Sequence, residues 1–216
     1  MRYEVALFDL DGTILDTIEG LAASLNAARA QQGLAPQSLE QVGAMVGNGA
    51  GKLMTRSIAA DPGADAIRLR ADFAAHYLEH CIEGSRPYPR ITEAIEGLRD
   101  AGVRCGVYTN KPDAPSQKLI THFFPGLFEL VQGNVEGVPV KPAAAPTLAT
   151  LQRLGVVPGR AIYVGDSEVD IQTAANAGME CISVDWGFKT HDFLLEHGAK
   201  CIASSPAQLT GLILRS

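Results

Sequence analysis

Residues 5–13 decide the fold, and they read VALFDLDGT. The first four, Val5 to Phe8, form a short apolar run that stops at polar residues and a glycine, as buried strands do before a turn. Similar apolar runs recur at residues 103–108, 161–164 and 181–184. The later runs follow stretches with helical spacing of apolar residues, at 91–102, 146–154 and 170–177. This alternation predicts a parallel β-sheet covered by helices on both faces.

Residues 16–85 interrupt the alternation. They contain helical stripes of apolar residues and no strand-like run, and the first stripe comprises Ile18, Leu21, Leu25 and Ala28. We therefore predict an α/β protein with two parts. A Rossmann-like parallel-sheet core comprises residues 1–15 and 86–216, and an inserted all-α domain comprises residues 16–85. The connecting segments are expected near residues 13–16 and 84–87.

The composition excludes several classes of protein. The chain has 216 residues, 46% hydrophobic and 19% charged, with a formal net charge of −6. Disordered chains are poorer in apolar residues, and nucleic-acid-binding proteins usually carry a basic excess. No apolar stretch is long enough to span a membrane, and the N-terminus lacks a secretory pattern, so we expect a cytoplasmic protein. The four cysteines form no CxxC pair and are expected to be reduced.

Two carboxylates follow the first strand. Asp9 and Asp11 are two residues apart, so both side chains point the same way if the backbone is extended. Carboxylates this close repel each other unless a cation lies between them or one is protonated. The alternative is a polar strand end that runs into a glycine turn.

Three further polar clusters fall at or near strand ends. Thr109-Asn110 can donate hydrogen bonds to an anion, Lys141 precedes a helix, and Asp166 and Asp170 lie one helical turn apart. Paired carboxylates suit Mg²⁺, which prefers oxygen ligands. Taken singly, each cluster has a structural explanation: a turn, a solvated lysine or a helix N-cap.

The order of these clusters resembles the four motifs of the haloacid dehalogenase superfamily, whose helical insert is a cap. Within it, the chain is most similar to phosphoglycolate phosphatases. The similarity rests on FDLDGT at residues 8–13, LDT at 15–17, VGNGA at 46–50 and PYP at 87–89.

The resemblance implies a role for each motif residue. Asp9 would be the nucleophile, Asp11 the general acid and base, and Lys141 the cation that pairs with nucleophile and phosphate. The residues implied to hold phosphate are Gly12, Thr13, Thr109 and Asn110. Mg²⁺ would be bound by Asp9, the Asp11 carbonyl and Asp166, with Asp170 supporting them.

The helical insert supplies weaker candidates. Asn48 and Gly49 precede a helix whose free N–H groups can bind an anion such as a substrate carboxylate, and Lys52 and Arg56 are possible partners. Solvated helix charges are the alternative for both. His76 and His80 are spaced as a zinc pair but lack a third ligand in the pattern. Arg90 stands where the family commonly has glycine, with no expected consequence.

The implied activity is Mg²⁺-dependent hydrolysis of a small phosphate monoester, with 2-phosphoglycolate as the leading substrate. Rival activities are those of a sugar-phosphate phosphatase, a pyrophosphatase or a β-phosphoglucomutase. Thr13 favours hydrolysis over the mutase. A non-catalytic binding protein should have lost a motif residue, and Asp9, Asp11, Lys141 and Asp166 are all present. Neither nucleic acid nor membrane is an expected partner, and monomer and homodimer both remain open.

Overall fold

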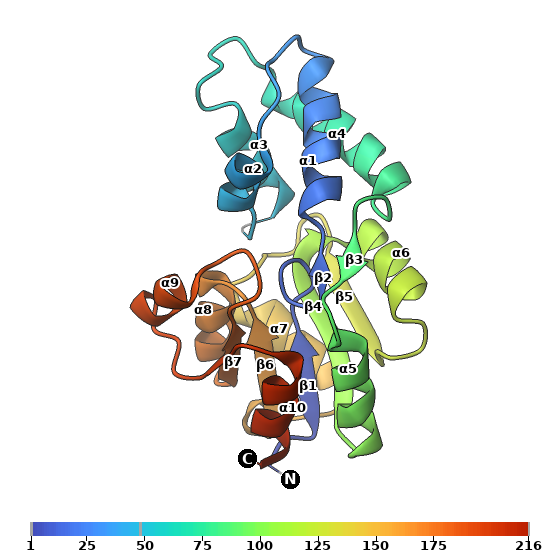
Figure 1. The fold of residues 1–216 in the computed structure, drawn as a ribbon, viewed down its shortest axis with the longest axis vertical. Helices are drawn as coiled ribbons and strands as arrows, with labels where there is room; N and C mark the ends of the chain where they lie inside the picture. Colours follow the sequence, from blue (N-terminus) through green and yellow to red (C-terminus); the bar gives the residue numbers. More distant parts are fainter. Residues whose placement is uncertain (1, 48, 216) are drawn as a thin grey trace.

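A six-stranded parallel sheet forms the core of the protein (Figure 1). A computed structural model of the chain describes residues 2–47 and 49–215. The strand order is β5-β4-β1-β6-β7-β8. The strands are β1 (Val5–Phe8), β4 (Arg104–Pro112), β5 (Leu130–Asn134), β6 (Ala161–Gly165), β7 (Glu180–Val184) and β8 (Ile202–Ala203). The four residues of β1 are fully buried, as predicted for the apolar run at residues 5–8, and the strand order places β1 inside the sheet between β4 and β6.

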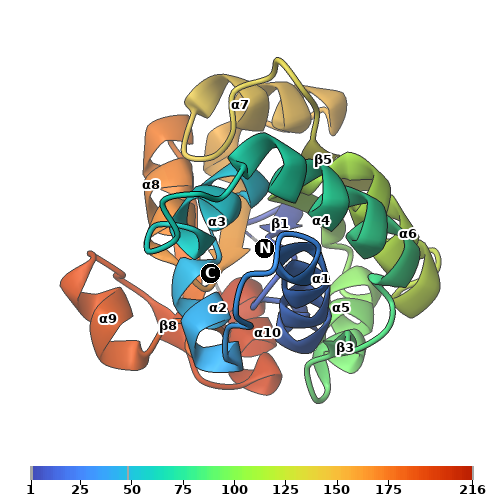
Figure 2. The same cartoon turned by 90° about the horizontal axis from the view of Figure 1, so that it is seen from above.

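Helices cover both faces of this sheet (Figure 2). On one face lie α5 (Ile91–Asp100), α6 (Asp113–Phe123) and α10 (Pro206–Arg215), and on the other α7 (Ala144–Arg153) and α8 (Glu168–Ala177). Because side chains alternate along a strand, Ala6 and Phe8 pack toward the first group, and Val5 and Leu7 toward the second. The short elements η1 (Pro158–Arg160) and α9 (His191–Glu196) complete the core.

Four helices form a separate layer beyond the carboxyl ends of the strands (Figure 1). They are α1 (Ile18–Ala30), α2 (Leu39–Met45), α3 (Ala50–Ser57) and α4 (Ala66–His80). Leu25 of α1, Val42 of α2, Met54 of α3 and Leu69 of α4 are buried in a hydrophobic cluster that continues into the core. We call these four helices the helical insert.

Two short strands connect the helical insert to the core, and the sequence did not predict them. β2 (Leu15–Asp16) pairs with β3 (Arg86–Pro87) in antiparallel orientation, and Arg86 Nη2 lies 2.7 Å from Asp16 Oδ2. The expectation that residues 16–85 lack strand structure is therefore wrong at Asp16. A two-residue strand is too short to produce a periodic pattern, and its pairing depends on a residue 70 positions away.

The remaining findings on the fold concern the cysteines and the helices. Cys81, Cys105, Cys181 and Cys201 are all free, as expected. In the described part of the chain, no helix combines the length and the apolar character needed to cross a lipid bilayer.

Candidate active site

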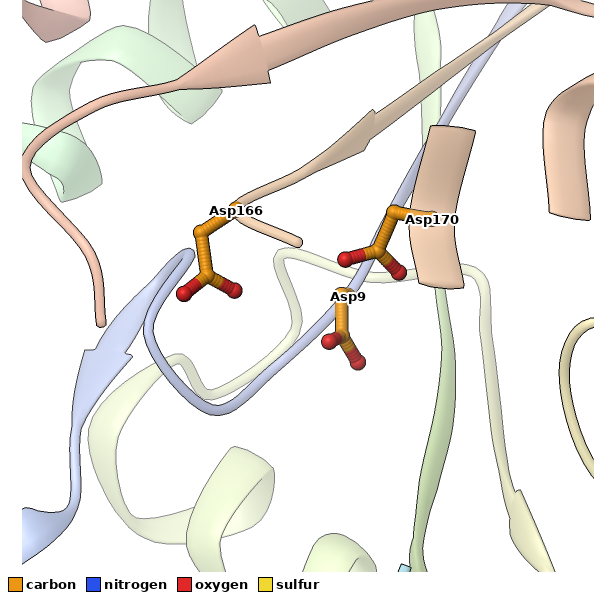
Figure 3. A group of neighbouring side chains, drawn as sticks. All are labelled: Asp9, Asp166 and Asp170. Carbon is orange, nitrogen blue, oxygen red and sulfur yellow. The ribbon is translucent and has the colours of Figure 1, made fainter. Parts of the chain in front are cut away.

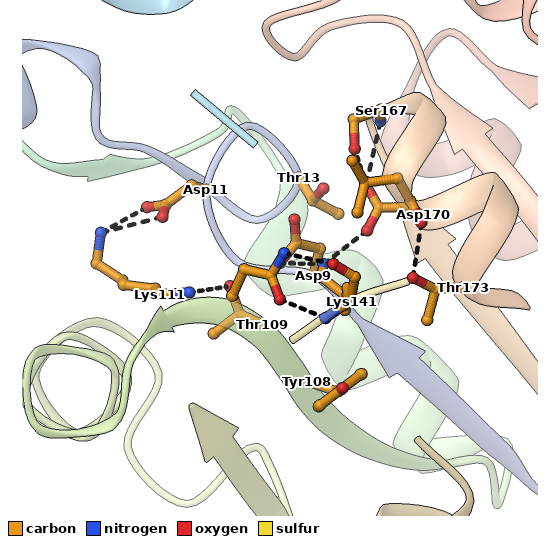
Figure 4. Close-up of polar contacts among 12 residues, drawn as sticks. Asp9, Asp11, Thr13, Tyr108, Thr109, Lys111, Lys141, Ser167, Asp170 and Thr173 are labelled. Carbon is orange, nitrogen blue, oxygen red and sulfur yellow. Dashed lines mark hydrogen bonds and ion pairs between the residues drawn. The ribbon is translucent and has the colours of Figure 1, made fainter. Parts of the chain in front are cut away.

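The polar clusters of the sequence meet at the carboxyl ends of three neighbouring strands (Figure 4). Asp9 follows β1, Thr109 and Asn110 lie in β4, and Asp166 follows β6. These strands are adjacent in the sheet, with β1 between the other two. Ligands of open parallel sheets bind beyond this edge.

Lys141 joins two of the buried carboxylates. Its Nζ lies 2.9 Å from Asp9 Oδ1 and 2.7 Å from Asp170 Oδ1, and it also donates to the Tyr163 hydroxyl at 3.0 Å. Burial lowers the pKa of Lys141, but the carboxylates of Asp170 and Asp9 raise it further, so that it stays well above its usual value. Lys141 is therefore a fixed cation beside Asp9.

Asp9, Asp166 and Asp170 form a cluster suited to a metal ion (Figure 3). One oxygen from each lies within 4.8 Å of the others, and all three residues are buried. Burial raises the pKa of Asp9 to about 6, although Lys141 lowers it. Burial and the neighbouring Asp170 and Asp9 raise the pKa of Asp166 well above its usual value. Three carboxylates and one ammonium group leave excess negative charge, so the donor set fits a divalent cation.

The three carboxylates differ in what else they contact. Both oxygens of Asp170 have partners, because Oδ1 accepts from Lys141 and Oδ2 accepts from the Ser167 backbone N–H at 3.1 Å and hydroxyl at 2.6 Å. Asp166 accepts from the Thr13 hydroxyl at 3.2 Å and the Phe188 N–H at 2.8 Å. Each oxygen of Asp166 thus also has a partner, but Asp9 and Asp166 line the cavity and Asp170 does not, so Asp9 and Asp166 are the better placed to bind a cation there and Asp170 to hold Lys141.

Gly12 allows Asp166 to approach the loop after β1. Its φ is +78°, and a Cβ atom there would lie 2.3 Å from Asp166 Oδ2. Any other residue would be strained in this conformation and would displace the carboxylate. The glycine of the first motif is therefore required by the close approach of two loops.

Asp11 does not join the acidic cluster with its side chain. Its carboxylate accepts from Lys111 Nζ at 2.8 and 3.1 Å (Figure 4). It also accepts from the Thr17 hydroxyl at 2.7 Å. Neither contact of the Asp11 carboxylate was predicted from the sequence. A lysine next to Thr109-Asn110 resembles an ordinary surface charge, and only its position at the strand edge opposite Asp11 points to its contact.

Asn110 connects loops rather than presenting its amide to the site. Its Nδ2 donates to the Lys141 carbonyl at 3.2 Å and to the Gly47 carbonyl of the helical insert at 3.3 Å, and its Oδ1 accepts from the Lys141 N–H at 2.7 Å. The Thr109 hydroxyl lies near Asp9 and lowers its pKa. The backbone at Asn110 thus remains the part of this residue that can face an anion.

A cavity of about 50 Å³ opens between the strand ends and the helical insert. The core contributes polar residues to it, namely Asp9, Asp11, Thr109, Asn110, Lys111, Asp166, Ser167 and Lys189. The helical insert contributes mainly apolar ones, which include Leu21, Val46, Leu53, Phe73 and Tyr77, together with Gly49.

The candidates from the helical insert are distributed unevenly around this cavity. Gly49 lines it, whereas Lys52 is exposed and is not among its lining residues. Arg56 Nη1 donates to the Met45 carbonyl at 2.9 Å within the helical insert. Asn48 lies outside the described residues. On α3, Leu53, Met54 and Ser57 form the buried side, so the structure does not bring Lys52 to the site.

The remaining candidates lie away from the cavity. His76 Nδ1 contacts the Ser24 hydroxyl at 3.0 Å and His80 Nδ1 contacts Glu83 at 3.0 Å, so neither is oriented toward a shared third ligand. Among the residues described, the acidic cluster is the one group of three or more side chains able to hold a metal. Arg90 has φ +65° at the start of α5, a conformation that explains why glycine is common there.

Comparisons with known proteins agree with this geometry. The family model of haloacid dehalogenase-like hydrolases matches residues 6–184. A phosphoglycolate phosphatase from Rhodospirillum rubrum is 36% identical over 197 residues, covering 86% of this chain and 80% of that protein. An N-acetylmuramic acid 6-phosphate phosphatase from Pseudomonas aeruginosa is 32% identical and covers 100% of this chain and 97% of that protein.

A solved structure shares the same architecture. A protein from Lactobacillus delbrueckii subsp. bulgaricus, provisionally assigned as a phosphoglycolate phosphatase, superposes with a TM-score of 0.93 at 34% identity, covering 99% of each chain. The chain therefore belongs to the haloacid dehalogenase-like hydrolase family. Within that family the relatives reported above are phosphatases, which is the class that the sequence resemblance implied.

Proposed function

We propose that the protein hydrolyses small phosphate monoesters, with Asp9 as the nucleophile. The observation that carries this proposal is the position of Asp9. It is a buried carboxylate at the end of the central strand, it lines the cavity, and Lys141 lies 2.9 Å away. An Asp9 oxygen attacks phosphorus and forms an aspartyl-phosphate, while the bond from phosphorus to the leaving alcohol breaks. Water then attacks the same phosphorus and restores Asp9.

Asp11 is the proposed acid and base of these two steps. It gives a proton to the leaving oxygen in the first step and takes one from the attacking water in the second. Its neighbours Lys111 and Thr17 fix the carboxylate in one orientation beside the cavity. A carboxylate held at one position transfers protons along a defined path.

Positive charge must offset the repulsion between Asp9 and an anionic phosphate. Lys141 supplies part of it, and Mg²⁺, held by Asp9, Asp166 and the Asp11 carbonyl with Asp170 in support, would supply the rest by neutralising phosphate oxygens. The Thr109 hydroxyl, the backbone at Asn110, and Gly12 and Thr13 are proposed to position the phosphate. Phosphoryl transfer depends mainly on such positioning and electrostatics.

We propose that residues 16–85 act as a cap that covers the substrate. The helical insert lies directly over the strand ends, and the short β2–β3 connection gives it a defined place to pivot (Figure 1). The backbone at Asn48 and Gly49 is retained as a candidate substrate contact. Closure would exclude water from the first step.

The proposed substrate is 2-phosphoglycolate. Support comes from relatives named phosphoglycolate phosphatase that are 31% to 36% identical to this chain. A sugar phosphate such as N-acetylmuramic acid 6-phosphate is the second candidate, because the relative with that activity matches along the whole chain.

A phosphate-release panel tests these proposals. The purified protein is assayed with 2-phosphoglycolate, N-acetylmuramic acid 6-phosphate, glucose 6-phosphate, a nucleotide and pyrophosphate, each with Mg²⁺ and with EDTA. We expect turnover that requires Mg²⁺ and is fastest with 2-phosphoglycolate. Faster release from a sugar phosphate by orders of magnitude would overturn the substrate and leave the mechanism standing. Undiminished turnover in EDTA would overturn the metal requirement.

A further inference from the structure

Lys111 is a buried cation at the cavity. It belongs to none of the four motifs, so they assign no role to it. It lies in β4 directly after Asn110, and its side chain is 2% exposed. Both oxygens of Asp11 accept from its Nζ, at 2.8 and 3.1 Å. Burial lowers its pKa, but Asp11 and Tyr77 raise it further, so the group stays charged. An ammonium group has three N–H donors, so Lys111 can serve a ligand in addition to Asp11.

Tyr77 places a second polar group beside Lys111. This residue belongs to α4 of the helical insert, and Lys111 Nζ lies 4.4 Å from the centre of its ring. The Tyr77 hydroxyl is buried, and its neighbour Lys111 can only donate to it, so within the described residues the hydroxyl proton has no acceptor. Burial raises the pKa of Tyr77 to about 12, so the hydroxyl keeps its proton and can donate it. A buried donor without an acceptor is costly, which points to a ligand that supplies one.

The other cations at the cavity are differently placed. Lys141 is held between Asp9 and Asp170. Lys189 is only half-buried, and its Nζ lies over the ring of Phe193. Lys111 and Tyr77 thus form a distinct polar pair set among the apolar residues Leu21, Leu53 and Phe73.

We propose that Lys111 and the Tyr77 hydroxyl bind a carboxylate in the leaving group of the substrate. The proposal rests on the proposed phosphatase activity and specifies its substrates as phosphate esters of short hydroxy acids. Asp11 protonates the leaving oxygen and touches Lys111, so a carboxylate one methylene group away from that oxygen falls beside Lys111. The carboxylate would satisfy the Tyr77 hydroxyl, and Lys111 would offset its repulsion from Asp9 and Asp166.

The test compares a carboxylate with its neutral amide. We would measure kcat/KM for 2-phosphoglycolate and 2-phosphoglycolamide in the wild type and in Lys111→Met, Tyr77→Phe and Lys189→Met. The wild type should prefer the carboxylate by about 100-fold or more, since sites built for a polar group reject analogues that lack it. Lys111→Met should lower activity on both substrates, because it also disturbs Asp11, and should reduce the preference to about fivefold or less. Tyr77→Phe should reduce the preference by about tenfold.

Lys189→Met is the matched control for the loss of a lysine at the same cavity, and it should retain most of the preference. Equal losses on both substrates in Lys111→Met and Tyr77→Phe would overturn the proposal and assign Lys111 to Asp11 alone. Tyr77→Phe keeps the ring over Lys111, so its result stands even if Lys111→Met fails to fold. Thermal melts of each variant would identify such a failure.

A binding measurement separates this proposal from the proposed activity. Calorimetry with Mg²⁺ compares 3-phosphonopropionate, in which a methylene replaces the ester oxygen, with propylphosphonate, which lacks the carboxylate. The wild type should bind the first about 100-fold more tightly, and Lys111→Met should lose this difference. Tight, Lys111-dependent binding without turnover of any phosphate would overturn the proposed function alone. Turnover with equal binding of both phosphonates would overturn the carboxylate subsite alone.

Discussion

The two walls of the cavity are built differently. On the core wall, the ends of three adjacent strands hold charged groups in fixed contacts, such as Lys141 between Asp9 and Asp170. On the wall from the helical insert, apolar side chains such as Leu53 and Phe73 dominate, and Tyr77 brings a single buried hydroxyl. From this difference we expect the core to fix the reaction, and the helical insert to contribute to substrate selection through its apolar wall and the Tyr77 hydroxyl.

The largest effect is expected at the nucleophile on the core wall. Asp9→Asn preserves the size of the side chain but removes the attacking oxygen anion, so phosphate release should fall by about 10³-fold or more. The assay follows phosphate release with Mg²⁺, and thermal melts confirm folding. Turnover at the wild-type rate would contradict the proposed mechanism.

Lys141→Met should have the next largest effect. It removes the cation between two buried carboxylates, so activity should fall by about 100-fold, and unfolding free energy by about 3–5 kcal/mol without metal. Denaturant titration and the phosphate-release assay measure the two losses. Loss of stability with unchanged activity would show that Lys141 is purely structural.

Metal binding to the core wall should depend on pH. The pKa of Asp9 rises from 3.8 to about 6 on folding without metal, so the folded protein binds this proton more tightly than the unfolded chain. This contribution to stability is full below about pH 4 and is lost as the pH rises through about 6. Mg²⁺ competes with this proton, so its apparent affinity should weaken by about tenfold for each pH unit below about 6.

Thermal melts at several Mg²⁺ concentrations, near pH 5 and near pH 7.5, measure this dependence, with Ca²⁺ and Na⁺ for comparison. Mg²⁺ should raise the melting temperature clearly at the higher pH and little at the lower one. An equal rise at both pH values would contradict binding by the acidic cluster.

A change on the wall from the helical insert should alter selection more than rate. Leu53→Ala enlarges the cavity, so activity on glucose 6-phosphate should rise relative to 2-phosphoglycolate by about fivefold, at a cost of about 2–4 kcal/mol in stability. The ratio of the two kcat/KM values is the readout. An unchanged ratio would remove Leu53 from substrate selection.

The smallest effect is expected at Lys52, which projects from the opposite side of the same helix. Lys52→Met should change kcat/KM by less than about twofold, because the side chain is exposed and outside the cavity. A loss of tenfold or more with 2-phosphoglycolate would restore Lys52 as a substrate contact and would require a different placement of α3 during turnover.

The sequence was most informative where an apolar strand leads directly into polar residues, because the end of the strand then places those residues at the edge of the sheet. The apolar run at residues 5–8 and the polar residues after it predicted a buried strand with Asp9 at its end, whereas the central place of this strand in the sheet was not predicted. Other parts depend on contacts between distant segments. β5 (Leu130–Asn134) is short and contains polar residues, so it shows no apolar run, yet it pairs with β4 at the sheet edge.

The site residues that were not predicted from the sequence also depend on contacts between distant segments. Lys111 is recognisable as part of the site only when Asp11, 100 positions earlier, lies against it. Tyr77 belongs to no motif. A tyrosine on an amphipathic helix usually packs in the hydrophobic core, so nothing in the sequence marks it as a site residue. Lys52 shows the reverse case: its place near a glycine-rich loop favours an anion contact, whereas the structure places it on the exposed side of α3.

The β2–β3 pair has a consequence for exchanging parts between proteins. Leu15 and Pro87 are direct neighbours across this pair, so the whole helical insert leaves and re-enters the core at one point. A different insert whose ends lie equally close can be grafted at these positions without altering the order of the core strands. The junction thereby makes the proposed cap, about a third of the chain, replaceable as a unit, while the strands of the core keep their own connections.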